Sequence, residues 1–326
     1  MQRDFNAAVA RAGLAPTVHN VLPARWQFDD TGAWLAADLA VALVHLDPLA
    51  RDLGLSCGAV LEAMVIALAD QGFTANDTDL WAMDDRATIP GHRMAARIDW
   101  AQGTTADGLS AVLDTRFTHR GVFDAAPVDL FGWGRSDAIL VTDPKGKDWL
   151  AGRHDWAGLQ LMRDAGVRQE LLGWMRLSDR HPRRRFDGLA RDALRFSRLE
   201  ALAARCALGP LWRLCDRFGL TAGLTSEARA TTSAQVVALF HRPAGESPVT
   251  SGRAYLRMCL EGADLGLAGW PMAAVSDQPQ TNAEICASYG IGSDRRLVQV
   301  IRFGVPSAPR PPRARRPLGE VILSVK

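Results

Sequence analysis

The side chains best suited to chemistry in this sequence are two arginines and a threonine in one short loop. Arg116, Thr118 and Arg120 alternate with Phe117 and His119. In an extended backbone, this spacing places two guanidinium groups and a hydroxyl on one side. A phosphate monoester needs forked donors to its oxygens and a short donor beneath them. The loop therefore predicts an anion site, and the alternative is a solvated basic loop, because surface arginines are common.

A second polar stretch, LAPTVHNVLPARWQF, follows a predicted helix over residues 5–12 and precedes a predicted strand. Pro16 stiffens its backbone, and Thr17, His19 and Asn20 follow at once. An asparagine side chain offers both a donor and an acceptor to the edge of a heterocycle. We interpret this opening loop as a cradle for a flat cofactor with polar edges. The alternative is an ordinary turn in which the asparagine satisfies its own backbone.

Glycines form a third candidate feature in GADLGLAGWPM, where Gly266 and Gly269 follow an apolar helix. Glycine permits close approach of the backbone to a flat ligand, and it equally permits a helix C-cap and a turn. The spacing is not a dinucleotide fingerprint, and no predicted strand directly precedes it. The sequence also lacks a P-loop, an H-E-x-x-H motif, a G-x-S-x-G motif and a convincing pair of carboxylates.

The composition is that of an ordinary globular protein, with 326 residues, 48% of them hydrophobic, and a net charge of +2. Such a balance gives no general field to attract nucleic acid or an anionic membrane. No stretch approaches the roughly 20 apolar residues of a membrane helix, and the first residues form no signal core. We therefore expect a cytoplasmic protein with no membrane partner. The five cysteines include no C-x-x-C pair, which disfavours a zinc site, and Cys57, Cys206 and Cys259 read as buried hydrophobes.

Two segments of the chain resemble each other. One starts at Val41 and the other at Val237; each reads Val-Ala-Leu, an apolar residue and a histidine, and we predict a buried strand at both places. Each then passes through a proline-containing loop into a long helix, with Ser56 and Ser251 as candidate N-caps. Within the helices, matching residues keep a constant offset: Met64 with Met258, Ala69-Asp70 with Ala263-Asp264, and Gly72 with Gly266. The pattern predicts an internal duplication that packs about a pseudo-two-fold axis, and chance similarity of two amphipathic helices is the alternative.

The remaining segments mix strands and helices. We predict a strand over residues 138–143, a helix over residues 154–176, and a further helix over residues 194–214 that is interrupted at Gly209-Pro210. The tail runs through a Pro/Arg-rich linker, and residues 320–325 read as a strand. The mixture favours a layered α+β fold.

Taken together, these residues resemble nitroreductase-type flavoproteins, and more closely the twin-repeat, Acg-type FMN-binding oxidoreductases. The residues that carry the resemblance are spread over nearly the whole chain: APTVHN from Ala15, LSCGA from Leu55, RFTHR from Arg116 with Phe123, GADLGLAG from Gly262, and RRPL from Arg315 with Glu320-Val321. The family usually continues Asn-x-Gln-Pro-Trp after its opening Pro-Ser/Thr. Here Leu22 and Ala24 replace the amide and the indole, and Trp26 could take over part of the packing.

The resemblance implies a nitroreductase-like α+β fold, with a central, mostly antiparallel sheet layered by helices and two tandem repeats forming a pseudo-dimer. The first repeat would span residues 1–110 and the second residues 111–326. A basic helical insertion at about 155–233 would act as a lid. Such a protein would be a monomer that mimics a dimer, with further oligomerisation left open.

The same resemblance implies FMN as cofactor and NAD(P)H as a transient reductant of an unidentified small organic acceptor. Arg116, Thr118 and Arg120 would hold the FMN phosphate, with Arg315 or Arg316. From the opening loop, Thr17 and Asn20 would contact ribityl and ring edges, with Pro16 and His19 beside them. The backbone near Gly266 and Gly269 would face the ring. No protein acid or nucleophile is required, because the flavin performs the redox chemistry.

Two other functions remain open. The chain could sequester flavin without turnover, with the insertion closing over it. Nucleic-acid binding through the arginines between Arg180 and Arg198 is disfavoured, because Asp179, Asp187 and Asp192 lie among them and mixed-sign runs usually face solvent.

Overall fold

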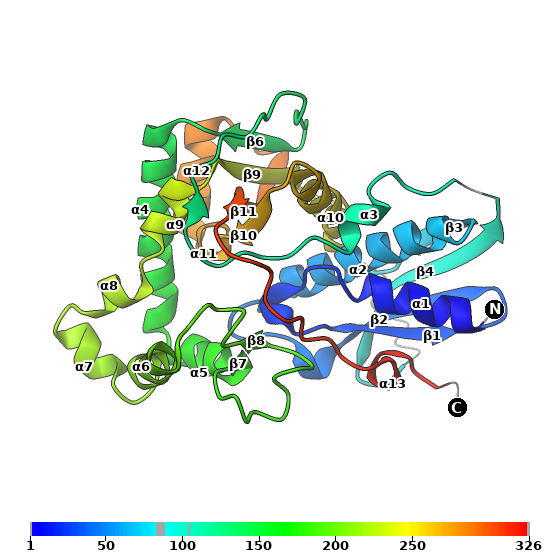
Figure 1. Ribbon diagram of the computed structural model, residues 1–326, viewed down its shortest axis with the longest axis horizontal. Coiled ribbons are helices and arrows are strands. Elements are labelled where there is room, and N and C mark those ends of the chain that lie inside the picture. Colours follow the sequence, from blue (N-terminus) through cyan, green and yellow to red (C-terminus); the bar gives the residue numbers. More distant parts are fainter. Residues whose placement is uncertain (1, 83–88, 104, 325–326) are drawn as a thin grey trace.

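Two separate antiparallel sheets, one from each half of the chain, form the framework of the protein (Figure 1). The computed structural model describes residues 2–82, 89–103 and 105–324. The first half forms a four-stranded sheet in the order β1-β2-β4-β3. The second half forms a sheet in the order β10-β11-β9-β6, with β5 paired to β11. Helices layer against both sheets, so the predicted α+β class with mostly antiparallel strands is confirmed.

The elements of the first half are, in chain order, α1 (Gln2–Ala12), the short 3-10 helix η1 (Val18–Asn20), β1 (Ala24–Phe28), β2 (Gly32–Asp38), η2 (Leu39–Val41), α2 (Arg51–Asp70), β3 (Phe73–Asp79) and β4 (His92–Gln102). The second half begins with α3 (Ser110–Leu113), β5 (Phe123–Asp124) and β6 (Ala138–Val141), and continues after an insertion with β9 (Val236–Pro243), α10 (Pro248–Asp264), β10 (Ala268–Pro271), α11 (Ala273–Asp277), α12 (Pro279–Tyr289), β11 (Arg295–Pro306) and α13 (Leu318–Val321).

The order of strands shows that the two halves share one topology. Each half runs through two strands, a long helix and two more strands. The strands β1, β2, β3 and β4 occupy the same places in their sheet as β6, β9, β10 and β11 in theirs. The long helices α2 and α10 are the pair whose sequences indicated a duplication. The predicted tandem arrangement is thus present in the fold, while the exact boundary between residues 110 and 111 stays a prediction.

The two halves meet through α2 and α10, which pack together at two glycines. A Cβ atom on Gly58 would lie 1.9 Å from the carbonyl oxygen of Val249, and one on Gly252 would lie 2.2 Å from the carbonyl oxygen of Leu55. Leu55 and Val249, like Gly58 and Gly252, are related by the same offset as Met64 and Met258. Equivalent residues therefore make reciprocal contacts, which is the signature of a two-fold interface. Glycine is required because only a backbone without Cβ allows this approach.

The helical insertion lies between β6 and β9. It contains α4 (Pro144–Arg163), α5 (Ala165–Trp174), the short parallel pair β7 (Met175–Arg176) and β8 (Leu189–Ala190), α6 (Arg198–Leu208), α7 (Trp212–Arg217), α8 (Thr221–Thr225) and α9 (Ala228–Ser233). Helix α4 packs on the sheet of the second half, whereas α6 to α8 project from the body of the molecule (Figure 1). The helical region thus starts before the predicted position of about 155.

Two predictions for the repeated segments are wrong. Residues 41–45 form the end of η2 and a turn rather than a strand, because β2 already lies between β1 and β4 in that sheet. Val41 and Leu43 pack against Val21 instead. The N-caps are also shifted, since Ser56 and Ser251 lie inside their helices. Helix α10 is capped by Ser247, which accepts a hydrogen bond from the Val249 N–H. At the start of α2, the Asp47 carboxylate accepts hydrogen bonds from the N–H groups of Arg51 and Leu53.

Other boundaries differ from the sequence-based expectations. The predicted helix over residues 154–176 is two helices, because Asp164 caps α5 by accepting a hydrogen bond from the Val167 N–H. The predicted break at Gly209-Pro210 is confirmed between α6 and α7. The described part of the predicted closing strand is instead α13 and one bridge between Ile322 and Trp26, and residue 325 lies outside the described residues. The strand predicted over residues 138–143 is confirmed as β6.

Helix α2 shows that the expectation of no stretch with the apolar length of a membrane helix was wrong. It is long and apolar enough to cross a bilayer by length and composition alone. However, 83% of its most apolar window is buried inside the protein. Its contacts with α1, α10 and the first sheet explain its hydropathy, because a helix that is apolar all round suits the centre of a large core.

Candidate functional site

The opening loop between α1 and β1 holds a conformation that ordinary side chains avoid. His19, Asn20 and Leu22 all have positive φ angles, of 42°, 55° and 53°. Such residues persist only where surrounding contacts hold them, and they cluster at functional sites. Two hydroxyls supply part of that support. Thr17 Oγ1 accepts a hydrogen bond from the Leu22 N–H at 3.2 Å, and Ser56 Oγ accepts one from the Val18 N–H at 3.1 Å.

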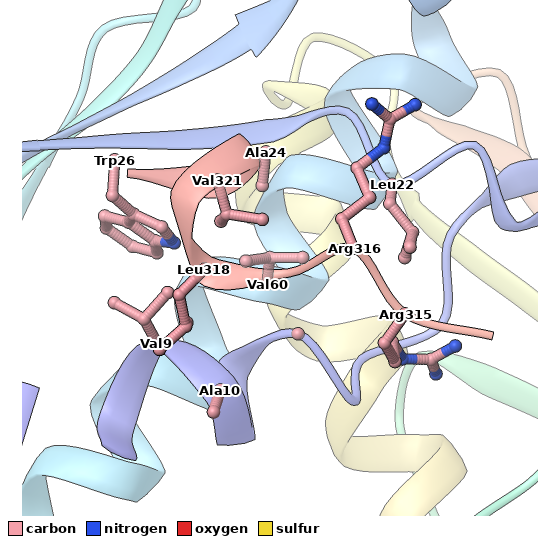
Figure 2. Close-up of a pocket in the computed structure, with 11 residues that line it drawn as sticks. Val9, Ala10, Leu22, Ala24, Trp26, Val60, Arg315, Arg316, Leu318 and Val321 are labelled. Carbon is pink, nitrogen blue, oxygen red and sulfur yellow. The ribbon is translucent and has the colours of Figure 1, made fainter. Parts of the chain in front are cut away.

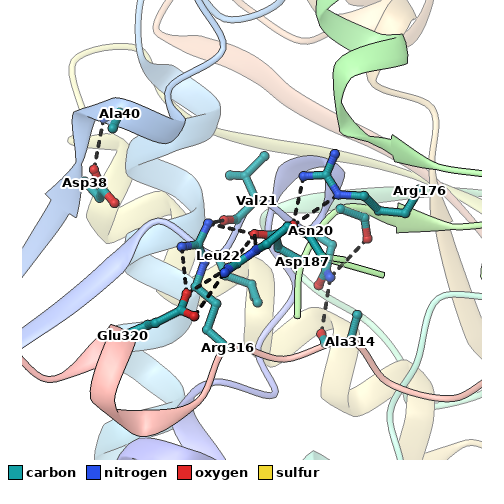
Figure 3. Close-up of polar contacts among 12 residues, drawn as sticks. Asn20, Val21, Leu22, Asp38, Ala40, Arg176, Asp187, Ala314, Arg316 and Glu320 are labelled. Atoms are coloured by element: carbon teal, nitrogen blue, oxygen red, sulfur yellow. Dashed lines mark hydrogen bonds and ion pairs between the residues drawn. The ribbon is translucent and has the colours of Figure 1, made fainter. Parts of the chain in front are cut away.

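Asn20 joins three regions of the chain that are remote in sequence (Figure 3). Its Nδ2 donates to the carbonyl oxygens of Gly188 and Ala314 at 3.2 and 3.3 Å, and its Oδ1 accepts from Arg315 Nη1 at 2.9 Å. The Gly188 N–H donates in return to the Asn20 carbonyl at 2.9 Å. The asparagine is thus held by both the insertion and the C-terminal tail. These hydrogen bonds are all to protein groups, so its side chain would reach a ligand only with a change of partners.

The basic loop lies directly beside the opening loop, as the phosphate interpretation requires. Arg116 is buried, and its Nη2 donates to the Leu14 carbonyl at 3.0 Å. Thr118 pairs with Gly269 in an isolated parallel β-bridge. Beside this bridge, the His119 N–H donates a hydrogen bond to the Gly269 carbonyl at 3.3 Å. Arg116, Thr118 and Gly269 are therefore brought together by tertiary structure, although more than 140 residues of sequence separate the loop from the glycine.

These residues line a small cavity between the two halves. Its walls come from the opening loop, the basic loop, α10, β10 and β11: Pro16, Arg116, Phe117, Thr118, Tyr255, Cys259, Gly269, Pro271 and Ile301. Its free volume is about 10 Å³, roughly the room for one water molecule. Burial raises the pKa of Cys259 to about 11 and the pKa of Tyr255 well above its ordinary value, so both groups are neutral at physiological pH.

Arg116, which lines this cavity, lies close to Arg313 and Arg315, and none of the three forms an ion pair among the described residues. Arg315 Nη2 donates to the Leu14 carbonyl at 3.4 Å, the same oxygen that Arg116 uses, and Arg313 Nη2 donates to the Arg116 carbonyl at 3.2 Å. Among the described residues, the buried Nε atoms of Arg116 and Arg315 have no hydrogen-bond partner, and the same holds for Arg316. Burial, with the charges of Arg116 and Arg313, lowers the pKa of Arg315 to about 9. The positive charges of this cluster have no negative partner, so the cluster suits a bound anion.

His19 of the opening loop lies near enough to Arg120 of the basic loop for the two charges to interact. Burial, aided by the charge of Arg120, lowers the pKa of His19 to about 4, so His19 is neutral at physiological pH. Burial likewise lowers the pKa of Arg120 to about 10; Glu227 opposes this shift and Arg302 adds to it. Arg120 thus faces a mixed environment, whereas Arg116 lies closer to Arg315 and has no ion pair among the described residues.

Arg316 differs from its neighbour Arg315 because carboxylates meet its charge (Figure 3). It forms ion pairs with Asp187 at 3.0 Å and Glu320 at 3.4 Å. Burial alone would raise the pKa of Asp187, but hydrogen bonds from Arg176 and Arg183 outweigh it and lower that pKa. Asp187 is therefore ionised and links the insertion to the C-terminal tail. Of the two predicted arginines, Arg315 is the one whose surroundings suit an anion.

The insertion touches both loops of the site. Gly188 holds Asn20, as described above, and Arg195 Nη2 donates to His119 Nδ1 at 3.0 Å. The His119 Nε2–H then donates to the Val122 carbonyl at 3.0 Å, so the neutral ring satisfies both nitrogens. Gly266, by contrast, occupies an exposed turn with φ of 77° after α10, outside the lining of the cavity.

A second cavity lies under α13, between α1 and β1 (Figure 2). Its free volume is about 50 Å³, and its walls are almost entirely apolar, with Trp26, Val60 and Leu318 among them. Arg315 and Arg316 also line it, but Figure 2 shows their guanidinium groups directed away from Trp26 and Leu318. Their aliphatic stems face the void, which therefore offers little polar surface to a phosphate or a heterocycle.

Several residues of this site could not be assigned from sequence. Tyr255 and Cys259 are four residues apart on α10 and share a helix face, but nothing in their types marks that face as a cavity wall. Arg313 belongs to the Pro/Arg-rich linker, where a basic composition was the only signal. Gly188 and Arg195 act through contacts that depend on how the insertion folds back.

No protein-family model matches the chain. In sequence, the chain is 32% identical over 115 residues to "Putative NAD(P)H nitroreductase Rv3131" of Mycobacterium tuberculosis, which covers 35% of this chain and 32% of that protein. It is 40% identical over 72 residues to "Putative NAD(P)H nitroreductase acg" of the same organism, or 22% of each chain. The matches thus span about a third or less of these curated relatives.

The structural comparison covers much more of the chain. A crystal structure described as a putative nitroreductase from Anabaena variabilis aligns with 93% of this chain and 88% of its own, with a TM-score of 0.51 at 9% identity. At that identity the likeness shows the fold alone. The chain thus has the fold of that nitroreductase structure, and two of its segments are similar in sequence to proteins named as NAD(P)H nitroreductases, acg among them.

Proposed function

We propose that the chain binds FMN between its two halves and passes electrons from NAD(P)H to a small organic acceptor. The observation that carries the proposal is the pair Arg116 and Arg315. Both donate to the Leu14 carbonyl, and burial lowers the pKa of both guanidinium groups. No ion pair to either arginine forms among the described residues. A phosphate group would supply the missing negative charge and acceptors.

The site suits the phosphate of FMN better than it suits the ring. The donors suit its phosphate, with Arg116, Arg315 and the Thr118 hydroxyl as its holders and Arg120 nearby. The free volume of about 10 Å³ is far below the roughly 300–1,000 Å³ of ordinary ligand pockets. A tricyclic ring therefore requires the insertion or the tail to shift. Release of Asn20 from Gly188 and Ala314 would free its amide for the ring edge.

The chemistry of the bound group would be acceptance of hydride from NAD(P)H and its passage to the acceptor. The chain's own residues would bind, orient and exclude water. The neutral Tyr255 and Cys259 would keep one wall of the cavity uncharged. The relatives named as NAD(P)H nitroreductases support the choice of reductant.

The test of the phosphate site is a comparison of FMN with riboflavin, which lacks the phosphate. We expect the purified protein to bind FMN at least tenfold more tightly than riboflavin, as measured by quenching of flavin fluorescence. The double variant Arg116→Ala/Arg315→Ala should lose that preference, whereas Arg180→Ala/Arg185→Ala, which removes two exposed arginines of the insertion, should keep it. Unchanged FMN binding in the first variant would contradict the assignment.

Sequestration of flavin without turnover is the second candidate function. The contacts of the insertion with Asn20 and His119, and the small free volume, favour it, because both restrict access to the site. The two functions differ in one measurement. Anaerobic addition of NAD(P)H to the FMN-loaded protein should bleach the flavin absorbance within seconds if the reductant reaches the ring. Tight FMN binding without bleaching would select sequestration.

A further inference from the structure

The end of the insertion exposes an apolar surface that neither the fold nor the proposed flavin site uses. It is formed by α6, α7 and α8, which project from the body of the molecule at the end remote from both termini (Figure 1). Leu199 and Phe218 are 79% and 68% exposed, and Leu202, Leu211, Leu214 and Leu224 are exposed with them. We name this set of six residues the apolar patch. Soluble proteins rarely cluster large apolar side chains on the surface, and such patches mark interaction sites.

The spacing of the patch follows the helices. Leu199 and Leu202 are three residues apart on α6, and Leu211, Leu214 and Phe218 follow an i, i+3, i+7 pattern around α7. These positions form a stripe on one side of each helix. The opposite side faces the protein, where Ala201 and Trp212 are buried. The insertion therefore has two apolar sides, and only one of them is covered by the fold.

Exposed arginines surround the apolar patch. Arg205, Arg213 and Arg217 are exposed and form no ion pair among the described residues, and Arg198 is 85% exposed beside Asp179. The acidic residues between positions 198 and 224 are Glu200, which caps α6 with Ser197, and Asp216, which accepts a hydrogen bond from Thr221. The outward charge of the patch is therefore positive.

We propose that the apolar patch docks the protein onto an anionic lipid surface. Leucine and phenylalanine side chains would enter the boundary between headgroups and acyl chains, while the arginines contact anionic headgroups. A second copy of the chain is a poorer occupant, because a two-fold contact would oppose the same arginines on both sides. The proposal departs from the sequence-based expectation of no membrane partner, which rested on the overall charge of +2 rather than on its distribution.

The experiment is flotation of the full-length protein with vesicles. We expect binding to vesicles of phosphatidylcholine with 30 mol% phosphatidylglycerol and at least tenfold weaker partitioning to pure phosphatidylcholine. Binding to the anionic vesicles should fall as sodium chloride rises from 50 to 500 mM, because salt screens the arginine component. Absence of binding to both vesicle types would overturn the proposal.

Matched variants separate the patch from general surface effects. Leu214→Ser/Phe218→Ser should reduce partitioning about tenfold or more, whereas Phe131→Ser, at an aromatic ring 95% exposed elsewhere, should not change it. Arg213→Glu/Arg217→Glu should remove the preference for phosphatidylglycerol, and Arg180→Glu/Arg185→Glu should keep it. Equal losses in patch and control variants would overturn the proposal.

Two further outcomes would identify a different occupant and so contradict the lipid assignment. Concentration-dependent dimerisation, measured by light scattering and lost in Leu214→Ser/Phe218→Ser, would show that the patch joins two copies of the chain. Partitioning that is insensitive to every patch variant would place lipid contact elsewhere. Circular dichroism and thermal unfolding confirm that each variant is folded before it is compared.

Discussion

The two halves of the molecule share one order of strands but differ in what covers their sheets. In the first half, α1 and α2 cover one face, and β3 shows strictly alternating burial. In the second half, α10 covers one face and α4, α11 and α12 cover the other. Strand β9 is accordingly apolar on both faces: Val236, Ala238 and Phe240 contact one layer, and Val237 and Leu239 contact the other.

The difference arises from what joins equivalent strands. A three-residue turn connects β1 to β2, whereas the insertion with α4 to α9 connects β6 to β9. Helix α4 of that insertion packs on the second face of its own sheet, where no equivalent helix is found among the described residues of the first half. A shared topology is thus compatible with two or three layers, and the burial of each strand follows from the layers rather than from the topology.

The largest expected effect tests whether the halves are joined as the reciprocal contacts indicate. Gly58→Ala would place its Cβ on the Val249 carbonyl and force α2 and α10 apart. We expect a loss of about 3 kcal/mol or more in the free energy of unfolding, because overpacking acts on a helix–helix contact. Gly252→Ala should behave similarly. Urea denaturation measures both.

Gly158→Ala is the matched control for these glycines. Gly158 also lies inside a helix, but a Cβ there would have nothing within 4 Å. The substitution should be neutral or stabilise the protein by about 0.5–1 kcal/mol, because alanine favours the helix. If all three variants unfolded alike, the close contact between the halves would be wrong.

A smaller effect concerns the contact between the opening loop of the first half and the basic loop of the second. The pKa of His19 is about 4, below the ordinary 6.5, so the unfolded chain takes up this proton first as pH falls. The free energy of unfolding should therefore increase by about 2 kcal/mol from pH 4 to 6.5, and acidification across this window should remove the same amount. His19→Asn, which tolerates a positive φ, should flatten that part of the pH profile. An unchanged profile would mean that His19 is not buried where the two loops approach each other.

The smallest expected effect concerns the N-terminal caps of the paired helices α2 and α10. Ser247 caps α10 with one hydrogen bond, whereas Asp47 accepts hydrogen bonds from the N–H groups of Arg51 and Leu53 at the start of α2, each at 2.8 Å. Ser247→Ala should cost about 1 kcal/mol in thermal or urea unfolding. Ser288→Ala, at an exposed position in α12, should be close to neutral. Equal costs for both serines would argue against the cap.

The sequence predicted the parts of the fold that depend on local pattern. The long apolar helices, their shared offset and the break at Gly209-Pro210 follow from helical periodicity and from proline. The strand predicted over residues 41–45 failed because its apolar residues are explained equally well by packing against Val21, and periodicity cannot distinguish the two. The predictions of Ser56 and Ser251 as N-caps were wrong because serines near a helix start are common, whereas the residue that caps the helix depends on where the chain turns.

For the candidate site, the sequence by itself determined the residue types: the arginines of the basic loop and the tail, and the hydroxyl, imidazole and amide of the opening loop. Only the tertiary structure decided which of them remain available to an anion. Arg315 and Arg316 are neighbours of the same type, yet Asp187 of the insertion pairs with Arg316, while Arg315 lies beside Arg116. The reason is physical: charge pairing depends on distance in space, and the partners that decide it come from segments remote in sequence.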